Sequence, residues 1–177
     1  MIKELLDKKH RNKPKNNWNI YASEIGRCDR RIFLRLKKLN SEDNTAIKLR
    51  RFEAGKQTQE RILKTLYEHG LIIVSEVNTP EHEFINGRAD AIISDNGSNI
   101  LLEVKSVKDS TFSHKYPPLS YIWQVQLYLH LFNLDKGVLL LENKNNQELR
   151  EFFIRRNQKT IDMLLERYSK LITQTKR

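Results

Sequence analysis

Two apolar segments joined by a short polar turn constrain this chain more than any other feature. The turn, residues 95–98 (Asp-Asn-Gly-Ser), has the composition of a tight hairpin loop, which predicts antiparallel strands over residues 88–94 and 99–107. Asp90 lies on the first segment and Glu103 on the second. Charges on apolar strands need partners. We therefore expect a hairpin that brings these two carboxylates together.

Strand alternation predicts which side chains share a face of this hairpin. Glu103 and Lys105 point to one side, whereas their apolar neighbours point to the other. Asp90, Glu103 and the backbone carbonyl of Val104 then form a hard oxygen site suited to Mg²⁺ or Mn²⁺. Such a cation activates water for attack on phosphorus, and Lys105 orients that water or offsets developing charge. The alternative is an exposed strand whose alternate residues are charged.

Size and charge narrow the classes of function. A chain of 177 residues is expected to form a single domain, residues 1–177, with a core that needs no disulfides. The net charge of +10, from 32 Lys and Arg against 22 Asp and Glu, favours a polyanionic partner such as nucleic acid. No signal peptide, membrane-spanning run or basic amphipathic helix stands out. We expect a soluble cytoplasmic protein, in a bacterial or phage-infected cell.

The periodicity along the chain predicts an α/β protein. A basic arm over residues 1–19 is followed by a helix from Ser23 to about residue 38 and a second helix ended by Gly70. Residues 83–94 are expected to form either a strand pair, with a hairpin-like turn at Asn86 and Gly87, or one bent strand. The remaining elements are a central mixed β-sheet and flanking helices: strands over 71–77, 83–94, 99–107, 137–142 and 149–155, and helices over 45–69, 119–132 and 158–173.

The helix after the hairpin carries a third group of polar residues. Gln124 and Tyr128 are four residues apart and so lie on one helix face. Alone, they are equally consistent with a solvated Gln and a half-buried Tyr. Together with the Asp, Glu and Lys of the hairpin, they resemble the PD-(D/E)xK nuclease superfamily. The order of the motifs is similar to the RecB-like exonuclease branch, which includes CRISPR-associated and phage recombination nucleases, and spans about residues 20–145.

This resemblance implies a restriction-endonuclease-like core and a divalent-metal-dependent DNA exonuclease, active in recombination, repair or phage DNA processing. In that family the Asp and Glu bind Mg²⁺ or Mn²⁺, the Lys assists hydrolysis, and the Gln and Tyr position DNA and the site. These roles fall on Asp90, Glu103, Lys105, Gln124 and Tyr128. Single- or double-stranded DNA is the implied partner, with a homo-oligomer or a recombination protein as further expectations.

The N-terminal helix adds weaker signals. Residues 23–31 are similar to the first helix of the family, in which a Cys-x-Arg pattern often occurs. In iron-sulfur members that cysteine is a cluster ligand. Cys28 is the one cysteine of this chain, so we expect no iron-sulfur cluster, no intramolecular disulfide, and a packed thiol. Glu24 is a candidate additional site residue, or else a charge that stabilises the helix N-terminus.

One position departs from the family pattern. RecB-like members often carry a metal-binding His four residues after a glycine of the second helix, and here Gln59 follows Gly55 at that spacing. An amide is a poor metal ligand beside imidazole. Either the site has one protein donor fewer or Glu60 replaces the His. The number of bound metal ions is therefore left open.

Basic residues near the predicted site are candidates for binding DNA phosphates, with a solvated helical face as the alternative. They are Arg27, Arg30, Arg31, Arg88, Lys108 and Lys115. Two further functions remain open on the same fold. One is a DNA-binding or assembly module without turnover, and the other is a structure-specific endonuclease.

Overall fold

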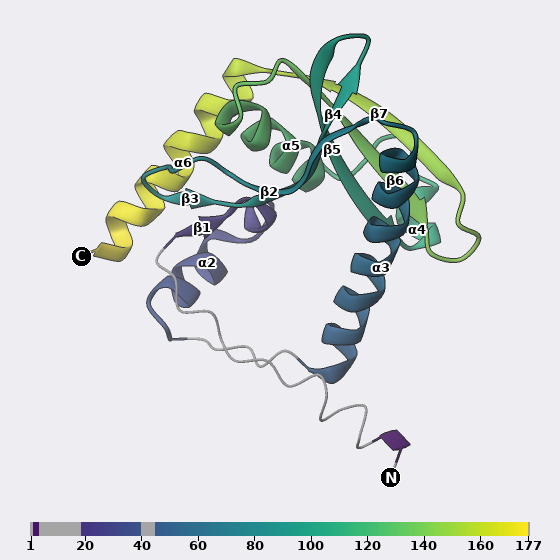
Figure 1. The fold of residues 1–177 in the computed structure, drawn as a ribbon. Coiled ribbons are helices and arrows are strands. Elements are labelled where there is room, and N and C mark those ends of the chain that lie inside the picture. The colour runs from purple at the N-terminus through teal and green to yellow at the C-terminus, as the bar shows by residue number, and fades with distance from the viewer. Residues whose placement is uncertain (1, 4–18, 40–44, 177) are drawn as a thin grey trace.

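A five-stranded mixed sheet forms the centre of the protein. The computed structural model describes residues 2–3, 19–39 and 45–176 (Figure 1). The strand order is β2-β4-β5-β6-β7, in which β5 and β6 are parallel and the other neighbours are antiparallel. The strands are β2 (Ile72–Asn78), β4 (Arg88–Asp95), β5 (Ser98–Val107), β6 (Lys136–Asn143) and β7 (Leu149–Arg155).

Helices cover both faces of this sheet, as predicted. On one face lies α3 (Ala46–Glu68), and on the other lies α5 (Leu119–Leu131), with α6 (Gln158–Lys176) and α2 (Asp29–Leu36) packed beyond it (Figure 1). Leu102 and Val104 of β5 belong to the α3 side of the core, whereas Leu101 and Val107 belong to the α5 side. β5 is therefore buried on both faces, and any charged side chain along it lies within the protein.

The predicted hairpin between β4 and β5 is confirmed. Its loop consists of Asn96 and Gly97, with φ angles of 49° and 78°. Positive φ at both positions is the requirement of a type I′ turn, which suits the twist of two antiparallel strands. The ladder runs from the pair Asp95–Ser98 to the pair Ala91–Leu102. This register directs Glu103 to the α5 face of the sheet.

The N-terminal helix is shorter than predicted. The expected helix from Ser23 is instead a 3₁₀ turn, η1 (Ala22–Glu24), and α2 begins at Asp29 after the cap residue Cys28. The tertiary contacts explain the difference, because the Ile25 carbonyl accepts a hydrogen bond from the Tyr168 hydroxyl of α6 instead of continuing a helix. The expectation of a packed thiol is also wrong, since Cys28 is exposed.

Of the two alternatives for residues 83–94, the strand pair with a turn at residues 86–87 is wrong. The segment before it forms a two-residue strand, β3 (Ile85–Asn86), that pairs in parallel with β1 (Ile20–Tyr21) and not with β4. This pairing ties the N-terminal segment to the start of β4. Neither β1 nor the short helix α4 (Asp109–Phe112) was predicted, because two- and four-residue elements carry no periodicity.

The longer elements follow their sequence signals. The Thr45 hydroxyl accepts from the Lys48 amide at the start of α3, and Gly70 follows its end with a φ of 68°. The N-terminal half of α3 extends beyond the sheet, where Ile47 and Phe52 are exposed (Figure 1). The predicted basic arm lies, apart from residues 2, 3 and 19, outside the described residues. Within the described residues, none of the helices combines the length and apolarity needed to cross a bilayer.

Replacement of Gly97 by Ala should lower the free energy of unfolding by about 1 kcal/mol, because a Cβ is unfavourable at positive φ. Gly55 provides the matched control. It lies inside α3 with open space around the position of a Cβ, so Gly55→Ala should raise stability by about 0.5–1 kcal/mol. Urea denaturation of both variants measures the two shifts. A destabilised Gly55→Ala protein would contradict the helical assignment there.

Candidate active site

Asp90 marks the point where β4 separates from β5. The ladder between the two strands ends at the pair Ala91–Leu102. Beyond it, the Asp90 Oδ2 atom accepts a hydrogen bond from the Val104 amide at 2.7 Å. A side-chain carboxylate thus takes the place of a backbone acceptor. A residue in an extended strand directs its N–H and C=O to the same edge, so the Val104 carbonyl lies on the Asp90 side of β5.

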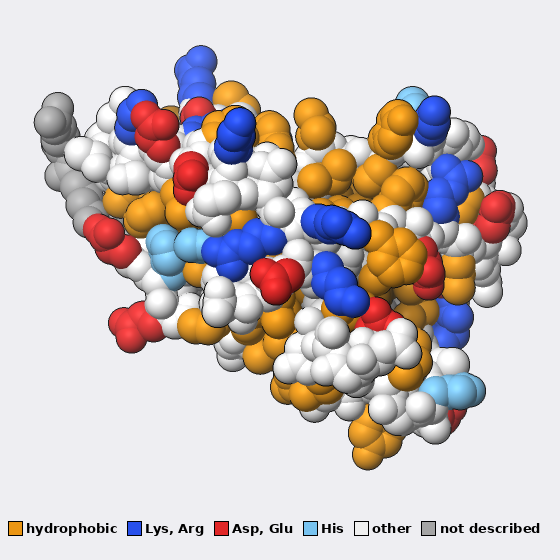
Figure 2. Space-filling model, turned by 90° about the horizontal axis from the view of Figure 1, so that it is seen from above, with side chains coloured by type: hydrophobic (Ala, Val, Ile, Leu, Met, Phe, Trp, Pro, Cys, Tyr) orange, Lys and Arg blue, Asp and Glu red, His pale blue; other side chains and the backbone are white. Residues whose placement is uncertain are grey.

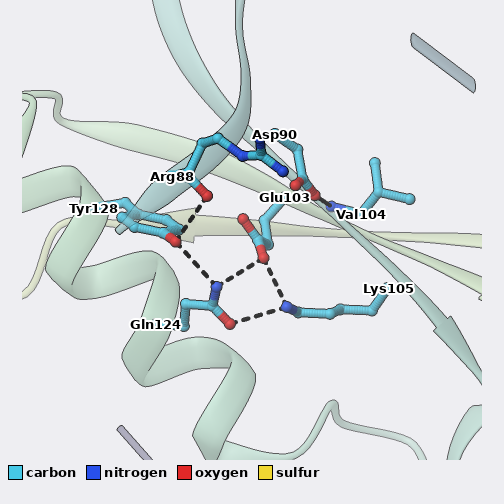
Figure 3. Close-up of polar contacts among 7 residues, drawn as sticks. All are labelled: Arg88, Asp90, Glu103, Val104, Lys105, Gln124 and Tyr128. Atoms are coloured by element: carbon cyan, nitrogen blue, oxygen red, sulfur yellow. Dashed lines mark hydrogen bonds and ion pairs between the residues drawn. The ribbon is translucent and has the colours of Figure 1, made fainter. Parts of the chain in front are cut away.

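The amide of Gln124 joins the two charged residues of β5 (Figure 3). Its Nε2 donates to Glu103 Oε1 at 2.9 Å, and its Oε1 accepts from Lys105 Nζ at 2.9 Å. Lys105 Nζ also lies 2.7 Å from Glu103 Oε1. A carboxylate only accepts and an ammonium only donates, so this arrangement admits one orientation of the amide. Gln124 is buried, which excludes the solvated alternative.

Tyr128 connects the same network to the start of β4. Its hydroxyl donates to the Arg88 carbonyl at 2.9 Å and accepts from Gln124 Nε2 at 3.3 Å. Burial, followed by the charge of Glu103, raises the pKa of this hydroxyl, which keeps it a donor. Residue 87, directly before Arg88, must be glycine. A Cβ at this position would lie 2.6 Å from Tyr128 Cε1 and 3.1 Å from Ala22 Cβ.

The site holds more negative charge than its surroundings balance. Burial, followed by the charge of Glu103, raises the pKa of Asp90 to about 8, against the opposing effects of the Val104 amide, Lys105 and Arg88. Burial lowers the pKa of Lys105, but the charge and hydrogen bond of Glu103 outweigh it and the net shift is upward. The second Glu103 oxygen, Oε2, is buried and has no hydrogen-bond partner within the part of the chain that the structure describes.

These observations test whether the residues fit a divalent cation. Within the described part of the chain, no three His, Cys, Asp or Glu side chains gather into a ready-made metal cage. What the site offers is two carboxylates, one of them with an unsatisfied buried oxygen, beside a backbone carbonyl. This hard oxygen donor set, short of positive charge, fits a cation that keeps several of its own water ligands.

Comparison with known proteins agrees with this geometry. No protein-family model matches the sequence. The CRISPR-associated exonuclease Cas4 of Saccharolobus solfataricus is 32% identical over 150 residues, which cover 79% of this chain and 73% of that protein. This chain belongs to the Cas4 family of RecB-like PD-(D/E)xK nucleases. The predicted resemblance is thereby confirmed.

Solved structures confirm the predicted α/β nuclease fold. The crystal structure of SSO0001 matches with a TM-score of 0.65 at 26% identity, over 94% of this chain and 84% of that one. The alkaline exonuclease LHK-Exo from Laribacter hongkongensis matches with a TM-score of 0.67 at 13% identity, over 98% of this chain and 92% of that one. At such low identity, the second likeness shows the fold alone.

Helix α3 does not bring Glu60 to the five central residues of the site, which are Asp90, Glu103, Lys105, Gln124 and Tyr128. Glu60 is exposed and forms an ion pair with Lys56 at 3.1 Å. Gln59, the residue at the position of the family His, is partly buried on the same helix. α3 packs against the sheet face that carries Leu102 and Val104, opposite the face that carries Glu103. The structure thus offers no replacement for the missing imidazole from Glu60.

Glu24 belongs to a separate network in the N-terminal segment. Its Oε2 accepts from Arg35 Nη2 at 2.7 Å and from the Tyr21 amide at 3.2 Å. Arg27, one of the predicted DNA-binding residues, lies 4.0 Å from its other oxygen. These contacts favour the structural interpretation of Glu24, in which it holds the 3₁₀ turn against α2.

The remaining predicted DNA-binding residues are exposed, as phosphate contacts require. Arg30, Arg31, Lys108 and Lys115 lie on or beside the short helices α2 and α4. Arg88 is also exposed and forms an ion pair with Glu76 of β2. The surface in Figure 2 shows basic side chains dispersed among apolar and acidic ones, without one continuous basic stripe on that face. Sequence reasoning missed Glu76, because a Glu on an edge strand resembles an ordinary surface charge.

Removal of the Tyr128 hydroxyl should cost about 1–2 kcal/mol of unfolding free energy, because the Arg88 carbonyl loses its donor inside the protein. The Tyr128→Phe protein, measured by urea denaturation, tests this expectation. Tyr116→Phe is the matched control, since Tyr116 is largely exposed and its change should leave stability within about 0.5 kcal/mol. Equal effects of the two changes would contradict the assigned hydrogen bonds.

Proposed function

We propose that this protein is a Mg²⁺- or Mn²⁺-dependent DNA exonuclease that hydrolyses phosphodiester bonds at the Asp90–Glu103 site. The observation that carries this proposal is the carboxylate pair of buried Glu103 and partly buried Asp90, whose charge is only partly balanced by Lys105 and Arg88 and which leaves one buried Glu103 oxygen unsatisfied among the described residues. The exonuclease named as the 32% identical relative supports the same reaction class. The net charge of +10 suits a polyanionic substrate.

Each residue of the site has a separate task in this proposal. Asp90, Glu103 and the Val104 carbonyl would hold the cation. A bound divalent cation supplies charge that activates water and neutralises a phosphate oxygen. Lys105, fixed by Glu103 and Gln124, offers an ammonium to the attacking water or to the negative charge that develops on the phosphoryl oxygens.

Gln124 and Tyr128, the two site residues of α5, act on the reaction through the residues that they position. Gln124 sets the directions of the Glu103 carboxylate and the Lys105 ammonium, because its amide bonds both. Tyr128 holds the strand that carries Asp90 through the Arg88 carbonyl. Preorganisation of this kind spares the reaction the cost of ordering charged groups.

Asp90→Asn should reduce Mg²⁺-dependent degradation of linear DNA by on the order of 100-fold or more, because the change removes a metal-binding charge. The substituted amide can still accept the Val104 hydrogen bond through its oxygen, so folding should survive. Asp95→Asn is the matched control, because Asp95 lies at the other end of β4 in an ion pair with Lys136. Undiminished cleavage by Asp90→Asn would overturn the proposal.

The choice of substrate separates the exonuclease from its alternatives. Linear and circular DNA, single- and double-stranded, should be compared in Mg²⁺ and in Mn²⁺. An exonuclease degrades the linear forms and leaves circular forms intact. Nicked or linearised circles would indicate an endonuclease, whereas tight binding without any cleavage would indicate a non-catalytic DNA-binding module.

Binding of the cation should be visible without any DNA. Mg²⁺ or Mn²⁺ at a hundredfold excess over its dissociation constant should stabilise the folded protein by about 2.7 kcal/mol. Thermal denaturation with and without the metal measures this shift, and Asp90→Asn should lose most of it while Asp95→Asn keeps it. A shift of equal size in all three proteins would place the cation elsewhere.

A further inference from the structure

Glu76 has an unusual backbone conformation for a residue inside a strand. Its φ is +50°, yet the flanking ladder pairs Ser75–Ala91 and Val77–Ala89 are intact, so Glu76 lies across from Asp90. Left-handed backbone at a residue other than glycine costs free energy and concentrates at functional sites. The other described residues of this kind follow helices or lie in turns: Lys38, Asn96, Asn133 and Gln147.

Among the described residues, the carboxylate of Glu76 forms an ion pair with Arg88. Its Oε1 atom lies 3.3 Å from Arg88 Nη2, in an ion pair without hydrogen-bond alignment. This oxygen is buried, and no described residue donates a hydrogen bond to it. The ion pair with Arg88 therefore compensates the burial of this one oxygen, while 37% of the Glu76 side chain stays exposed. A strained residue with an under-satisfied charge is retained more readily for a function than for stability.

Both the backbone and the side chain of Arg88 are held by other residues. Its carbonyl accepts from Tyr128, and its guanidinium is paired with Glu76. Figure 3 draws the guanidinium next to Asp90, and its positive charge is among the effects that oppose the raised pKa of Asp90. About half of the side chain, 54%, remains exposed. A ligand that reaches the carboxylate site also reaches this guanidinium.

We propose that Glu76 is a positioning residue that aims Arg88 at a phosphate of the DNA bound beside Asp90 and Glu103. This inference rests on the proposed nuclease function. A guanidinium presents a planar fork of donors that matches the oxygens of a phosphate. A long exposed side chain loses conformational freedom when it binds a ligand. The ion pair with Glu76 restricts Arg88 before DNA binds, so less conformational entropy is lost on binding.

The sign of one substitution separates this role from simple electrostatics. Glu76→Gln removes a negative charge close to the DNA, and through-space repulsion alone predicts tighter binding of DNA. If Glu76 positions Arg88, the same change weakens binding and slows cleavage. A purely structural role predicts lower stability without a specific dependence on Arg88.

The test compares Glu76→Gln, Arg88→Gln and the double variant. Steady-state cleavage of linear DNA in Mg²⁺ gives kcat and KM, and fluorescence anisotropy of labelled DNA in Ca²⁺ gives affinity without turnover. Each single change should lower kcat/KM about tenfold, the scale of one hydrogen bond to a charged group. The double variant should be no worse than Arg88→Gln, because both changes disable the same contact. Glu81→Gln removes an exposed charge from the next loop and is the control.

A second variant guards against an effect on folding. Glu76→Gly relieves the left-handed backbone, so its unfolding midpoint in urea should equal or exceed that of the wild type. Its kcat/KM should fall as far as that of Glu76→Gln. Full activity of Glu76→Gly, additive losses in the double variant, or unchanged or tighter DNA binding by Glu76→Gln would each overturn the inference. A wild type that binds DNA without cleaving it would refute the nuclease proposal, and the anisotropy series would still decide the role of Glu76.

Discussion

The burial of Glu103 on β5 is the constraint on which the rest of the site depends. β5 has helices against both faces, so this carboxylate has little access to water. Charge in that position must be balanced from within the protein. Lys105 and Gln124 supply part of the balance, and the orphaned Oε2 atom shows that the balance is incomplete. The hydrogen bond from Gln124 of α5 and the fit of the site to a cation both involve this one buried group.

Much of the fold was predictable from local patterns, whereas the grouping of Gln124 and Tyr128 with the hairpin was expected from the family resemblance, and the catalytic roles of the five residues stay a prediction. A two-residue turn between apolar strands sets the register, and strand alternation then places Glu103 and Lys105 on one face. Helical spacing brings Gln124 and Tyr128 to the same side. Each of these inferences uses only neighbours in the chain. The hydrogen bonds of Gln124 with Glu103 and Lys105 form because α5 packs against the sheet face that carries those two residues.

The parts that escaped prediction depend on contacts between distant segments. The N-terminal helix begins at Asp29 because the Ile25 carbonyl is bound by Tyr168, 143 residues later. The pairing of β1 with β3 joins residues that share no local signal. The ion pair of Glu76 with Arg88 depends on a left-handed residue that propensity argues against. Local reasoning has no access to such contacts.

The two halves of α3 make different contacts, and this difference affects which substitutions the helix can accept. Ile62 and Leu63, in the C-terminal half, pack into the core, and Thr58 and Arg61 bind the buried Glu142. The half that begins at Ala46 leaves Ile47 and Phe52 in contact with water. Substitutions of these two exposed side chains are therefore expected to disturb the packed core little. These two apolar positions can therefore change without any repacking of the core beneath the other half of the helix.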